Sequence, residues 1–359
     1  MLKISLQALS LKNYRNFDNL DLRFGDKLVF IIGENGSGKT NILESISLLS
    51  PGRGIRFARF EEIIKNGCSS WHSKFTLQSK LGLAEITNNF TLHTSRTLAY
   101  NGSKISSNEL TKLTSIIWLT PQMEGIFLDT SSERRRFLDR IVYSFDPLHA
   151  RRINKYEHYQ SQRLRALVQE NGCSDLWLKG IEESMSKSAE EIDQKRREII
   201  NIMQSSIDNL HTAFPRAQLA ITNLLLEPKD TSSDFVGYYS DKLKDYRQKD
   251  KYSGKTNFGV HKTDFIVSYK DKNQLAKYCS TGEQKAMLIS IMLSQIDCLK
   301  NNARIMPILL LDEIFVHLDE RRKDYLLDYI IDSQMQSFIT ATETGSMANK
   351  VKNMQLIEI

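Results

Sequence analysis

Residues 33–40 read Gly-Glu-Asn-Gly-Ser-Gly-Lys-Thr and match the phosphate-loop pattern GxxxxGK[ST] at every fixed position. The apolar run 28–32 comes before this loop and the helix-like run 41–46 comes after it, so the local order is strand, loop, helix. Glycines let such a loop turn its backbone amides inward at a helix N-terminus, where they bind phosphate groups. The residues that we expect to bind a nucleotide are Gly33, Glu34, Asn35, Gly36, Ser37, Gly38, Lys39 and Thr40. Within this loop we expect Lys39 to contact the β- and γ-phosphates and the Thr40 hydroxyl to hold Mg²⁺.

The composition limits the class of protein. With 359 residues the chain forms one large or two ordinary domains, and its net charge of +6 permits a polyanionic partner without requiring one. Its four cysteines lie far apart and form no CxxC pair, which disfavours both a zinc site and a disulfide framework. Neither a secretory signal nor an apolar run of about eighteen residues is present, so we expect a cytoplasmic protein with no membrane partner.

The order of strand and helix patterns predicts an insertion. Alternating apolar residues predict three strands within residues 3–32 and further β structure in 74–100, where Asn101-Gly102 is a hairpin turn signal. From Ser131 to about residue 210 the pattern is helical and rich in charge, with a predicted turn at Asn171-Gly172. We therefore expect an α/β head made of residues 1–124 and 257–359, interrupted by a largely helical domain at 125–256.

A second acidic motif lies near the C-terminus. The apolar residues 308–311 end in Asp312-Glu313, as in a Walker B strand. We expect Asp312 to bind Mg²⁺ and Glu313 to act as the general base that polarises the attacking water. Gln122 follows the short apolar strand 115–119, where a Q-loop glutamine would contact the metal and the water. An ordinary polar loop residue is the alternative for Gln122.

The stretch Ser280-Thr281-Gly282-Glu283-Gln284-Lys285 lies directly before an apolar helix and has the form of an ABC-type signature. Ser280, Gly282 and Glu283 would present a hydroxyl, an amide and a helix N-terminus to a γ-phosphate. In ABC-type ATPases the signature closes over the ATP that a second subunit binds, and Asp319 fits the D-loop at that seam. We expect an ATP-dependent head-to-tail homodimer with an ABC-type P-loop fold, in which a mixed central sheet with flanking helices adjoins an antiparallel β subdomain.

Two further basic segments have more than one interpretation. Arg15, which lies between Tyr14 and Phe17, is a candidate nucleotide contact, although a solvated turn is equally compatible with the composition. The cluster Ser50-Pro51-Gly52-Arg53-Gly54-Ile55-Arg56 fits either a surface loop or a cationic lid near the phosphates.

These motifs, taken together with the helical insertion, resemble the RecF family of bacterial recombination mediators over nearly the whole chain. The stretches that carry the resemblance are Leu11-Lys12-Asn13-Tyr14-Arg15-Asn16-Phe17, the loop 33–40, Ser50-Pro51-Gly52-Arg53-Gly54, Ser132-Glu133-Arg134-Arg135-Arg136-Phe137-Leu138-Asp139, the signature 280–285 and Leu310-Leu311-Asp312-Glu313. The phosphate loop is common to many ATPases, whereas the arginine-rich stretch after a Q-loop is particular to this family.

The resemblance implies an ATPase that DNA stimulates weakly and that works in recombinational repair, replication restart and the SOS response. It implies binding to single-stranded and gapped duplex DNA without sequence specificity, and action with RecO and RecR in loading recombinase. The chain departs from the family pattern at Gly259-Val260-His261-Lys262-Thr263-Asp264, where the family has Gly-Pro-His-Arg-Asp-Asp. It also carries Glu283 where Gln is frequent and Glu313 where a second Asp is common.

The insertion holds a dense group of basic residues, which include Arg134, Arg135, Arg136, Arg151 and Arg152. Such a group is able to neutralise several phosphates and give salt-dependent DNA binding. A solvated, ion-paired helical face is the alternative interpretation.

Two other classes of ATPase share the nucleotide motifs. The ATP-hydrolysing subunit of a membrane transporter is disfavoured because Ala341, Thr342 and Glu343 stand where a switch histidine would follow the last strand. A chromosome-maintenance ATPase requires a long heptad arm, and this insertion is too short for one.

Overall fold

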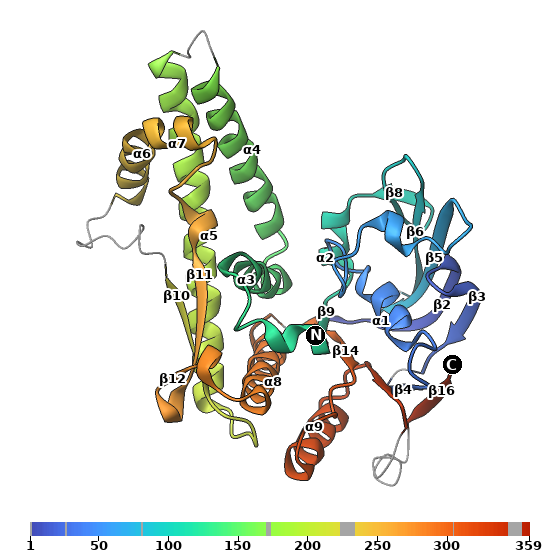
Figure 1. Ribbon diagram of the computed structural model, residues 1–359. Coiled ribbons are helices and arrows are strands. Elements are labelled where there is room, and N and C mark those ends of the chain that lie inside the picture. The colour runs from blue at the N-terminus through green and yellow to red at the C-terminus, as the bar shows by residue number, and fades with distance from the viewer. Residues whose placement is uncertain are drawn as a thin grey trace. The chain divides into compact units, whose positions relative to one another are not determined.

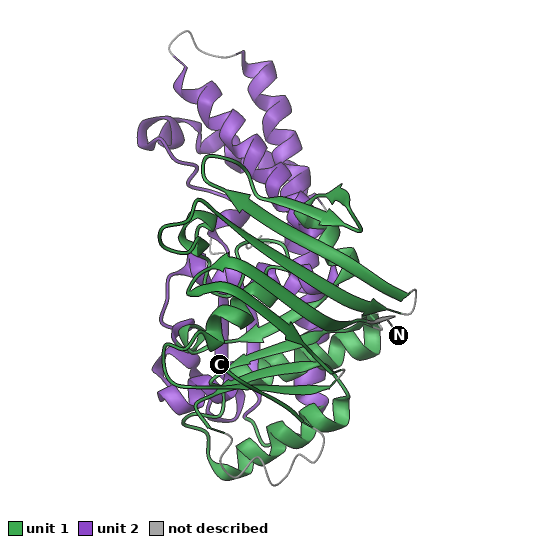
Figure 2. Ribbon diagram, turned by 90° about the vertical axis from the view of Figure 1, so that its right-hand side faces the viewer, with its two compact units in different colours: residues 1–124, 210–214, 288–359 green, residues 125–209, 215–287 purple. Residues whose placement is uncertain are grey.

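The computed structural model describes residues 2–25, 27–79, 82–169, 174–222, 234–303, 305–343 and 354–359. They form two compact units, of which unit 1 comprises residues 1–124, 210–214 and 288–359 and unit 2 comprises 125–209 and 215–287 (Figure 2). The turn predicted at Asn171-Gly172 lies outside the described residues.

The core of unit 1 is a five-stranded sheet. Its order is β16 (Gln355–Glu358), β4 (Leu28–Ile32), β15 (Ser337–Ala341), β14 (Ile308–Asp312) and β9 (Ile116–Leu119). Every pair in this sheet is parallel, where a mixed sheet was predicted. The three inner strands and the edge strand β9 are apolar almost throughout because a parallel sheet is covered on both faces. Parallel pairing also brings the carboxyl ends of these strands to one edge.

The predicted antiparallel β subdomain is confirmed as a six-stranded sheet in unit 1. Its order is β3 (Phe17–Arg23), β2 (Ser5–Tyr14), β5 (Ser70–Ser79), β6 (Gly82–Thr91), β7 (Thr97–Tyr100) and β8 (Ser103–Ile105), and Asn101-Gly102 forms the turn between the last two. Its aromatic core includes Trp71, whose ring centroid lies 5.6 Å from that of Tyr14. This unit also contains β1 (Leu2–Lys3), which pairs with β13 (Ile305–Met306), and the helices α1 (Lys39–Ser47), α2 (Leu110–Leu113) and α9 (Glu320–Ser333).

Unit 2 is built on a helical hairpin. The helices are α3 (Ser131–Phe145), α4 (His149–Val168), α5 (Asp175–Asn209), α6 (Phe235–Asp245) and α7 (Arg247–Ser253), and the small antiparallel sheet is β10 (Ala217–Thr222), β11 (Asp264–Tyr269) and β12 (Gln274–Leu275). Figure 1 shows α4 beside α5, and a core around Tyr156, Met185, Ile192, Tyr239 and Phe258 joins these helices to α6. Helix α8 (Thr281–Cys298) belongs to unit 2 up to Met287 and to unit 1 beyond it.

The compact units differ from the predicted domains at residues 257–287. The sequence pattern predicts this stretch as part of the head, whereas in the structure it packs with unit 2. The physical reason is strand pairing, because β11 pairs with β10 from Ala217↔Tyr269 to Thr222↔Asp264 and also contacts α3. Sequence periodicity shows that a strand exists but does not show which partner it takes.

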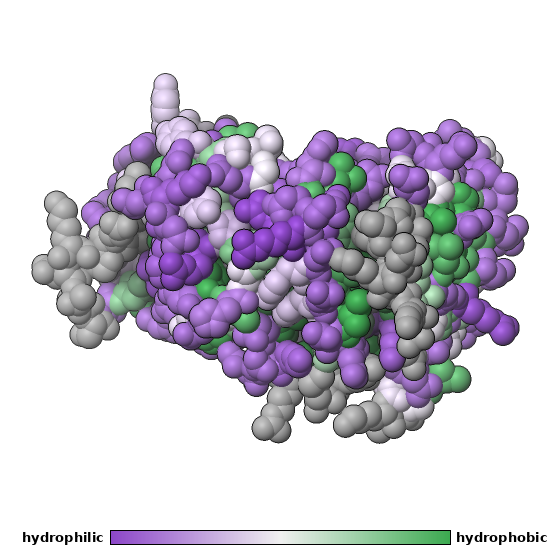
Figure 3. Space-filling view, turned by 90° about the horizontal axis from the view of Figure 1, so that it is seen from below, coloured by the Kyte–Doolittle hydropathy of each residue, from purple (hydrophilic) through white to green (hydrophobic). Residues whose placement is uncertain are grey.

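Hydrophilic side chains predominate on the face drawn in Figure 3, and apolar residues lie there in small groups. Among the described residues, none of the helices combines the length and the apolar character that crossing a bilayer requires.

Candidate nucleotide-binding site

The phosphate loop follows β4 and opens α1, as its pattern predicts. Gly38 precedes the helix with φ 114°, and a Cβ on this residue would lie 2.5 Å from Phe17 Cζ. Only glycine combines that backbone conformation with so close a neighbour. Lys39 is 4% exposed, and its ammonium group donates to the carbonyl oxygens of Gly33 (2.7 Å) and Glu34 (2.9 Å). The loop thus curls around a buried positive charge.

Asp312 ends β14 beside this loop. The Thr40 hydroxyl donates to its carboxylate at 3.0 Å, and the Thr340 hydroxyl donates to the same carboxylate at 2.7 Å. The sheet register explains the second contact, because Asp312 pairs with Thr340 across β14 and β15. Thr340 also accepts a hydrogen bond from the Glu313 amide at 3.0 Å, so one hydroxyl positions both acidic residues.

The donor set around Asp312 fits Mg²⁺. Its carboxylate is buried, with 4% of the residue exposed, and no lysine or arginine in the described part of the chain forms an ion pair with it. A buried carboxylate is normally paired with a cation or bound to a metal. Hard oxygen ligands from Thr40 and Asp312, together with phosphate oxygens, are what Mg²⁺ prefers. The metal would neutralise the negative charge of the phosphates at this position.

A pocket of about 120 Å³ lies over the phosphate loop. It is lined by Asn35, Gly36, Gly38, Lys39, Thr40, Asn41, Arg56 and Glu313. Glu313 has φ 49°, a left-handed conformation that is uncommon for a residue with a side chain and that recurs at functional sites. Glu313, the candidate general base, therefore lines the same pocket as the residues of the phosphate loop.

A chain of amides holds Arg56 at this pocket. Its guanidinium donates to Asn41 Oδ1 (2.8 Å), the Asn41 amide donates to Asn16 Oδ1 (2.7 Å), and the Asn16 amide donates to the Ser37 carbonyl (2.9 Å). Arg96 supports the preceding loop by donating to the Leu48 carbonyl at 2.7 Å. Of the two interpretations of residues 50–56, the cationic lid is the one that this position of Arg56 favours.

Arg15, predicted as a nucleotide contact, is not among the residues that line the pocket. Its guanidinium donates to both oxygens of the fully buried Glu44 carboxylate, at 2.8 Å and 2.6 Å, and also to the Glu62 carbonyl. This ion pair accounts for its orientation and raises the pKa of Arg15. Arg15 thus fastens the β2–β3 turn to α1, and its contact with a nucleotide stays a prediction.

Gln122 and Asp319 lie at the edges of this region within unit 1. Gln122 is exposed in the short turn Pro121–Gly125 that follows β9, and β9 pairs with β14 up to Leu119↔Leu311. It thus shares the sheet edge with Asp312 but does not line the pocket. Asp319 is exposed and caps α9 by accepting a hydrogen bond from the Arg322 amide at 2.9 Å.

The signature stretch of unit 2 forms the first turn of α8. The Glu283 carboxylate accepts hydrogen bonds from the Ser280 amide (2.9 Å) and hydroxyl (3.0 Å), which makes a capping box. An ion pair with Lys272, together with these bonds from Ser280, lowers the pKa of Glu283 to about 2. Lys272 thereby offsets the negative charge beside the exposed Ser280 hydroxyl. A Cβ added to Gly282 would meet no atom within 4 Å, so this side of the turn is open.

The arginines predicted to bind DNA fall into two groups: three make hydrogen bonds or ion pairs with residues of unit 2 that lie elsewhere in the sequence, and two are exposed at its surface. Arg134 donates through two nitrogens to Asp264, at 2.8 Å and 2.7 Å, and Arg135 donates to the Thr263 carbonyl at 3.0 Å. Arg152 is bound by the carboxylates of Asp146 and Glu191. These three guanidinium groups have partners within unit 2, and their contact with DNA phosphates stays a prediction.

Arg136 and Arg151 remain at the surface of unit 2. Arg136 is 62% exposed in its side chain and forms a solvent-exposed i,i+3 ion pair with Glu133. Arg151 is exposed on α4, and within the described residues no carboxylate pairs with it. Of the five predicted arginines, these two keep their charge toward solvent.

The departure from the family pattern at residues 259–264 lies at a junction inside unit 2. His261 Nδ1 is 2.9 Å from the Tyr156 hydroxyl, the Val260 carbonyl accepts from Arg196, and Asp264 binds Arg134. A Cβ on Gly259, which has φ 141°, would collide with the hydroxyls of Tyr156 and Tyr239. This segment therefore joins α3, α4, α5 and α6.

Comparisons with known proteins agree with this architecture. A family model described as the RecF/RecN/SMC N terminal domain matches residues 5–358. Proteins named DNA replication and repair protein RecF are 48% identical in Rickettsia africae and 49% identical in Rickettsia canadensis, with 100% of both chains covered in each case.

Solved structures show the same fold. A structure of the recombination mediator protein RecF with ATPrS in the RecFOR pathway superposes with a TM-score of 0.86 at 22% identity, covering 99% of this chain and 96% of that one. An Smc head domain from Pyrococcus furiosus gives a TM-score of 0.55 at 16% identity, over 96% of this chain and 92% of that one. The parallel sheet with its phosphate loop, the antiparallel sheet and the inserted helical hairpin thus occur together in relatives that match from end to end, and the chain belongs to the RecF family.

Proposed function

We propose that this protein is an ATP-dependent DNA-binding protein of recombinational DNA repair and replication restart. The observation that supports this most strongly is the convergence of Lys39, Thr40, Asp312 and Glu313 on one pocket in a chain that matches RecF proteins over its full length. ATP is the expected nucleotide, since relatives of this fold were determined with ATP or an analogue.

In the proposed reaction the protein positions the triphosphate and the attacking water. The loop amides and the Lys39 ammonium would bind the β- and γ-phosphates, and Thr40 and Asp312 would hold Mg²⁺. Glu313 would accept the proton of the water, and its backbone is fixed by the Thr340 hydroxyl. Gln122 would orient the same water from the end of β9.

The signature turn supplies the second half of the site from another copy of the chain. Ser280 is exposed and Gly282 is half-buried on an open face at the N-terminus of α8, where the helix dipole favours an anion. Their proposed ligand is the γ-phosphate held by the loop of a neighbouring copy, with Asp319 at the seam. ATP would therefore drive head-to-tail dimerisation, and hydrolysis, which DNA would stimulate from a low rate, would require the dimer.

DNA is the proposed partner of the dimer, in gapped or single-stranded form, and RecO and RecR are proposed to act with it in loading recombinase. Within unit 2 the exposed Arg136 and Arg151 support a contact with phosphates that carries no base specificity.

Light scattering of the purified chain, with and without ATP and a gapped duplex, tests this proposal. ATP is expected to double the molar mass of the parent. Ser280→Arg is expected to bind ATP and remain a monomer, because a large cation at the signature turn prevents closure. Normal dimerisation and hydrolysis by Ser280→Arg would refute the shared site.

A further inference from the structure

Helix α7 presents a tyrosine to solvent with almost no cover. Tyr252 is 96% exposed, and Lys249, Lys251 and Lys255, each within three positions of it in the sequence, are exposed as well. We call these four residues the α7 platform. We propose that the α7 platform binds single-stranded DNA, with an unpaired base stacked on the Tyr252 ring and the lysines beside the phosphates. This inference rests on the proposed DNA-binding function and adds a second site to it.

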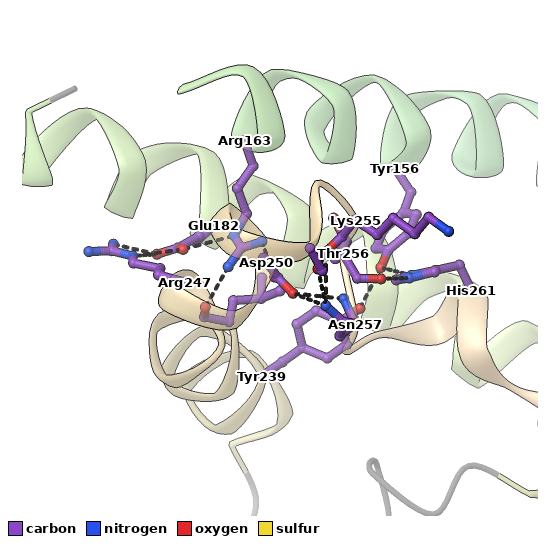
Figure 4. A network of polar contacts seen from close by, with 12 residues as sticks. Tyr156, Arg163, Glu182, Tyr239, Arg247, Asp250, Lys255, Thr256, Asn257 and His261 are labelled. Atoms are coloured by element: carbon purple, nitrogen blue, oxygen red, sulfur yellow. Dashed lines mark hydrogen bonds and ion pairs between the residues drawn. The ribbon is translucent and has the colours of Figure 1, made fainter. Parts of the chain in front are cut away.

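A buried acid fixes the turn that carries the platform. Asp250 is 0% exposed, and its carboxylate accepts hydrogen bonds from Arg163 Nη1 (2.6 Å) and from the backbone and side-chain nitrogens of Asn257 (both 2.9 Å) (Figure 4). The Asn257 amide also donates to the Lys255 carbonyl at 3.0 Å. The chain on both sides of Tyr252 is therefore held in one conformation, and Gly254 with φ 62° ends the helix.

The same network fastens α7 to the hairpin. Arg163 is fully buried on α4 and donates to Glu182 of α5 at 2.9 Å, while Arg247 at the start of α7 donates to Glu182 at 2.5 Å (Figure 4). A buried ion-pair network adds little net stability, because desolvation opposes the attraction between the charges, but it does fix geometry. The network fixes a seven-residue helix whose exposed residues include Lys249, Lys251 and Tyr252 of the platform, and Lys255 follows the end of that helix.

The electrostatic balance of this surface favours a polyanion. Asp250 is the single acidic residue in the stretch 248–255, and its buried carboxylate is ion-paired with Arg163. The exposed charged residues of that stretch are therefore all positive. Within the described residues the Tyr252 side chain has no hydrogen-bond or ring partner, which leaves both faces of its ring free. A bare aromatic ring among cations is the arrangement with which proteins bind single strands, because stacking needs an exposed base and lysines attract phosphates.

The proposal is tested by fluorescence anisotropy of the full chain with a labelled single strand and with a blunt duplex of equal length. Tyr252→Ala is expected to weaken single-strand binding by about five- to one-hundred-fold and to leave duplex binding unchanged, because paired bases offer no free face. The matched control Tyr252→Phe keeps the ring and is expected to stay within about twofold of the parent. Lys251→Gln combined with Lys255→Gln is expected to lower the salt slope of single-strand binding by about 1.4.

The outcomes separate this proposal from the one on which it rests. Failure of the parent to bind either a single strand or a gapped duplex would refute the DNA-binding function and the platform together. If the parent binds and Tyr252→Ala binds the single strand equally well, the platform alone is refuted, and an acidic protein surface becomes the better occupant. Equal losses on single strand and duplex would also refute base stacking. Because Tyr252 lies outside the core, none of these results is confounded by misfolding.

Discussion

The Thr40 hydroxyl lies 3.0 Å from the Asp312 carboxylate, although 272 positions of the sequence separate the two residues. This direct hydrogen bond joins the end of the phosphate loop to the Walker B strand. Asp312 also accepts from Thr340, so α1, β14 and β15 are tied together at the edge of the sheet that carries the pocket.

Thr340→Val is expected to lower the ATP hydrolysis rate by at least about tenfold while ATP binding stays near the parental level. Valine keeps the shape of threonine but removes the hydroxyl that accepts from the Glu313 amide and donates to Asp312. Steady-state hydrolysis, together with equilibrium binding of a fluorescent ATP analogue, checks this expectation. Unchanged hydrolysis would show that Thr340 does not position the acidic pair.

Glu313→Gln is expected to bind ATP and to accumulate as a closed, ATP-loaded dimer. The amide cannot accept the proton of the attacking water, whereas the residues that bind phosphate are unchanged. Size-exclusion chromatography after incubation with ATP measures the dimer, and retained nucleotide measures its loading. If Glu313→Gln released phosphate at the parental rate, Glu313 would not be the general base.

Arg163→Met is expected to destabilise unit 2 by about 3–5 kcal/mol, because Asp250 and Glu182 would lose a buried cationic partner. Arg136→Gln is the control, since its exposed ion pair with Glu133 is worth at most about 1 kcal/mol. The free energies of unfolding are compared by urea denaturation. Similar values for the two variants would contradict the role of Arg163 as the centre of the network.

Acid is expected to weaken the fold through His261. Burial lowers the pKa of this imidazole to about 4 from its ordinary value of 6.5. Between these two values the unfolded chain binds a proton that the folded chain excludes, so stability falls as the pH drops from 6.5 to 4. His261→Gln removes that proton and is expected to show a shallower decline in a pH series of thermal unfolding midpoints. Parallel declines in the parent and the variant would assign the acid sensitivity to other groups.

The motifs and the fold class were predictable because they depend on local patterns. The phosphate loop requires glycines at fixed offsets, and the strands of the parallel sheet are continuous apolar runs. Residues whose position depends on strand register were not predictable. Thr340 lies in β15, and only its pairing opposite Asp312 places it at the site.

The acidic partners of buried or half-buried arginines were also not predictable from the sequence. Arg15 and Arg134 have the composition of ligand-binding arginines, yet Glu44 and Asp264 neutralise them from distant positions. Two pocket residues could have been found from the sequence: Asn41 directly follows Thr40 of the phosphate loop, and Arg56 lies in the segment 50–56 that was considered as a cationic lid. No sequence pattern indicated Asn16, because its contact with Ser37 depends on how the β2–β3 turn meets the phosphate loop in the fold.

The shared site is tested most directly by mixing two inactive variants. Lys39→Met lacks the loop cation, and Ser280→Ala lacks the signature hydroxyl without adding bulk at the seam, so each alone is expected to hydrolyse no ATP above background. A mixed dimer contains one intact site, formed by Lys39 of one copy and Ser280 of the other. An equimolar mixture is therefore expected to recover up to roughly a quarter of the parental activity per chain. A mixture as inactive as its components, or full activity of Ser280→Ala alone, would contradict a nucleotide site shared between two copies.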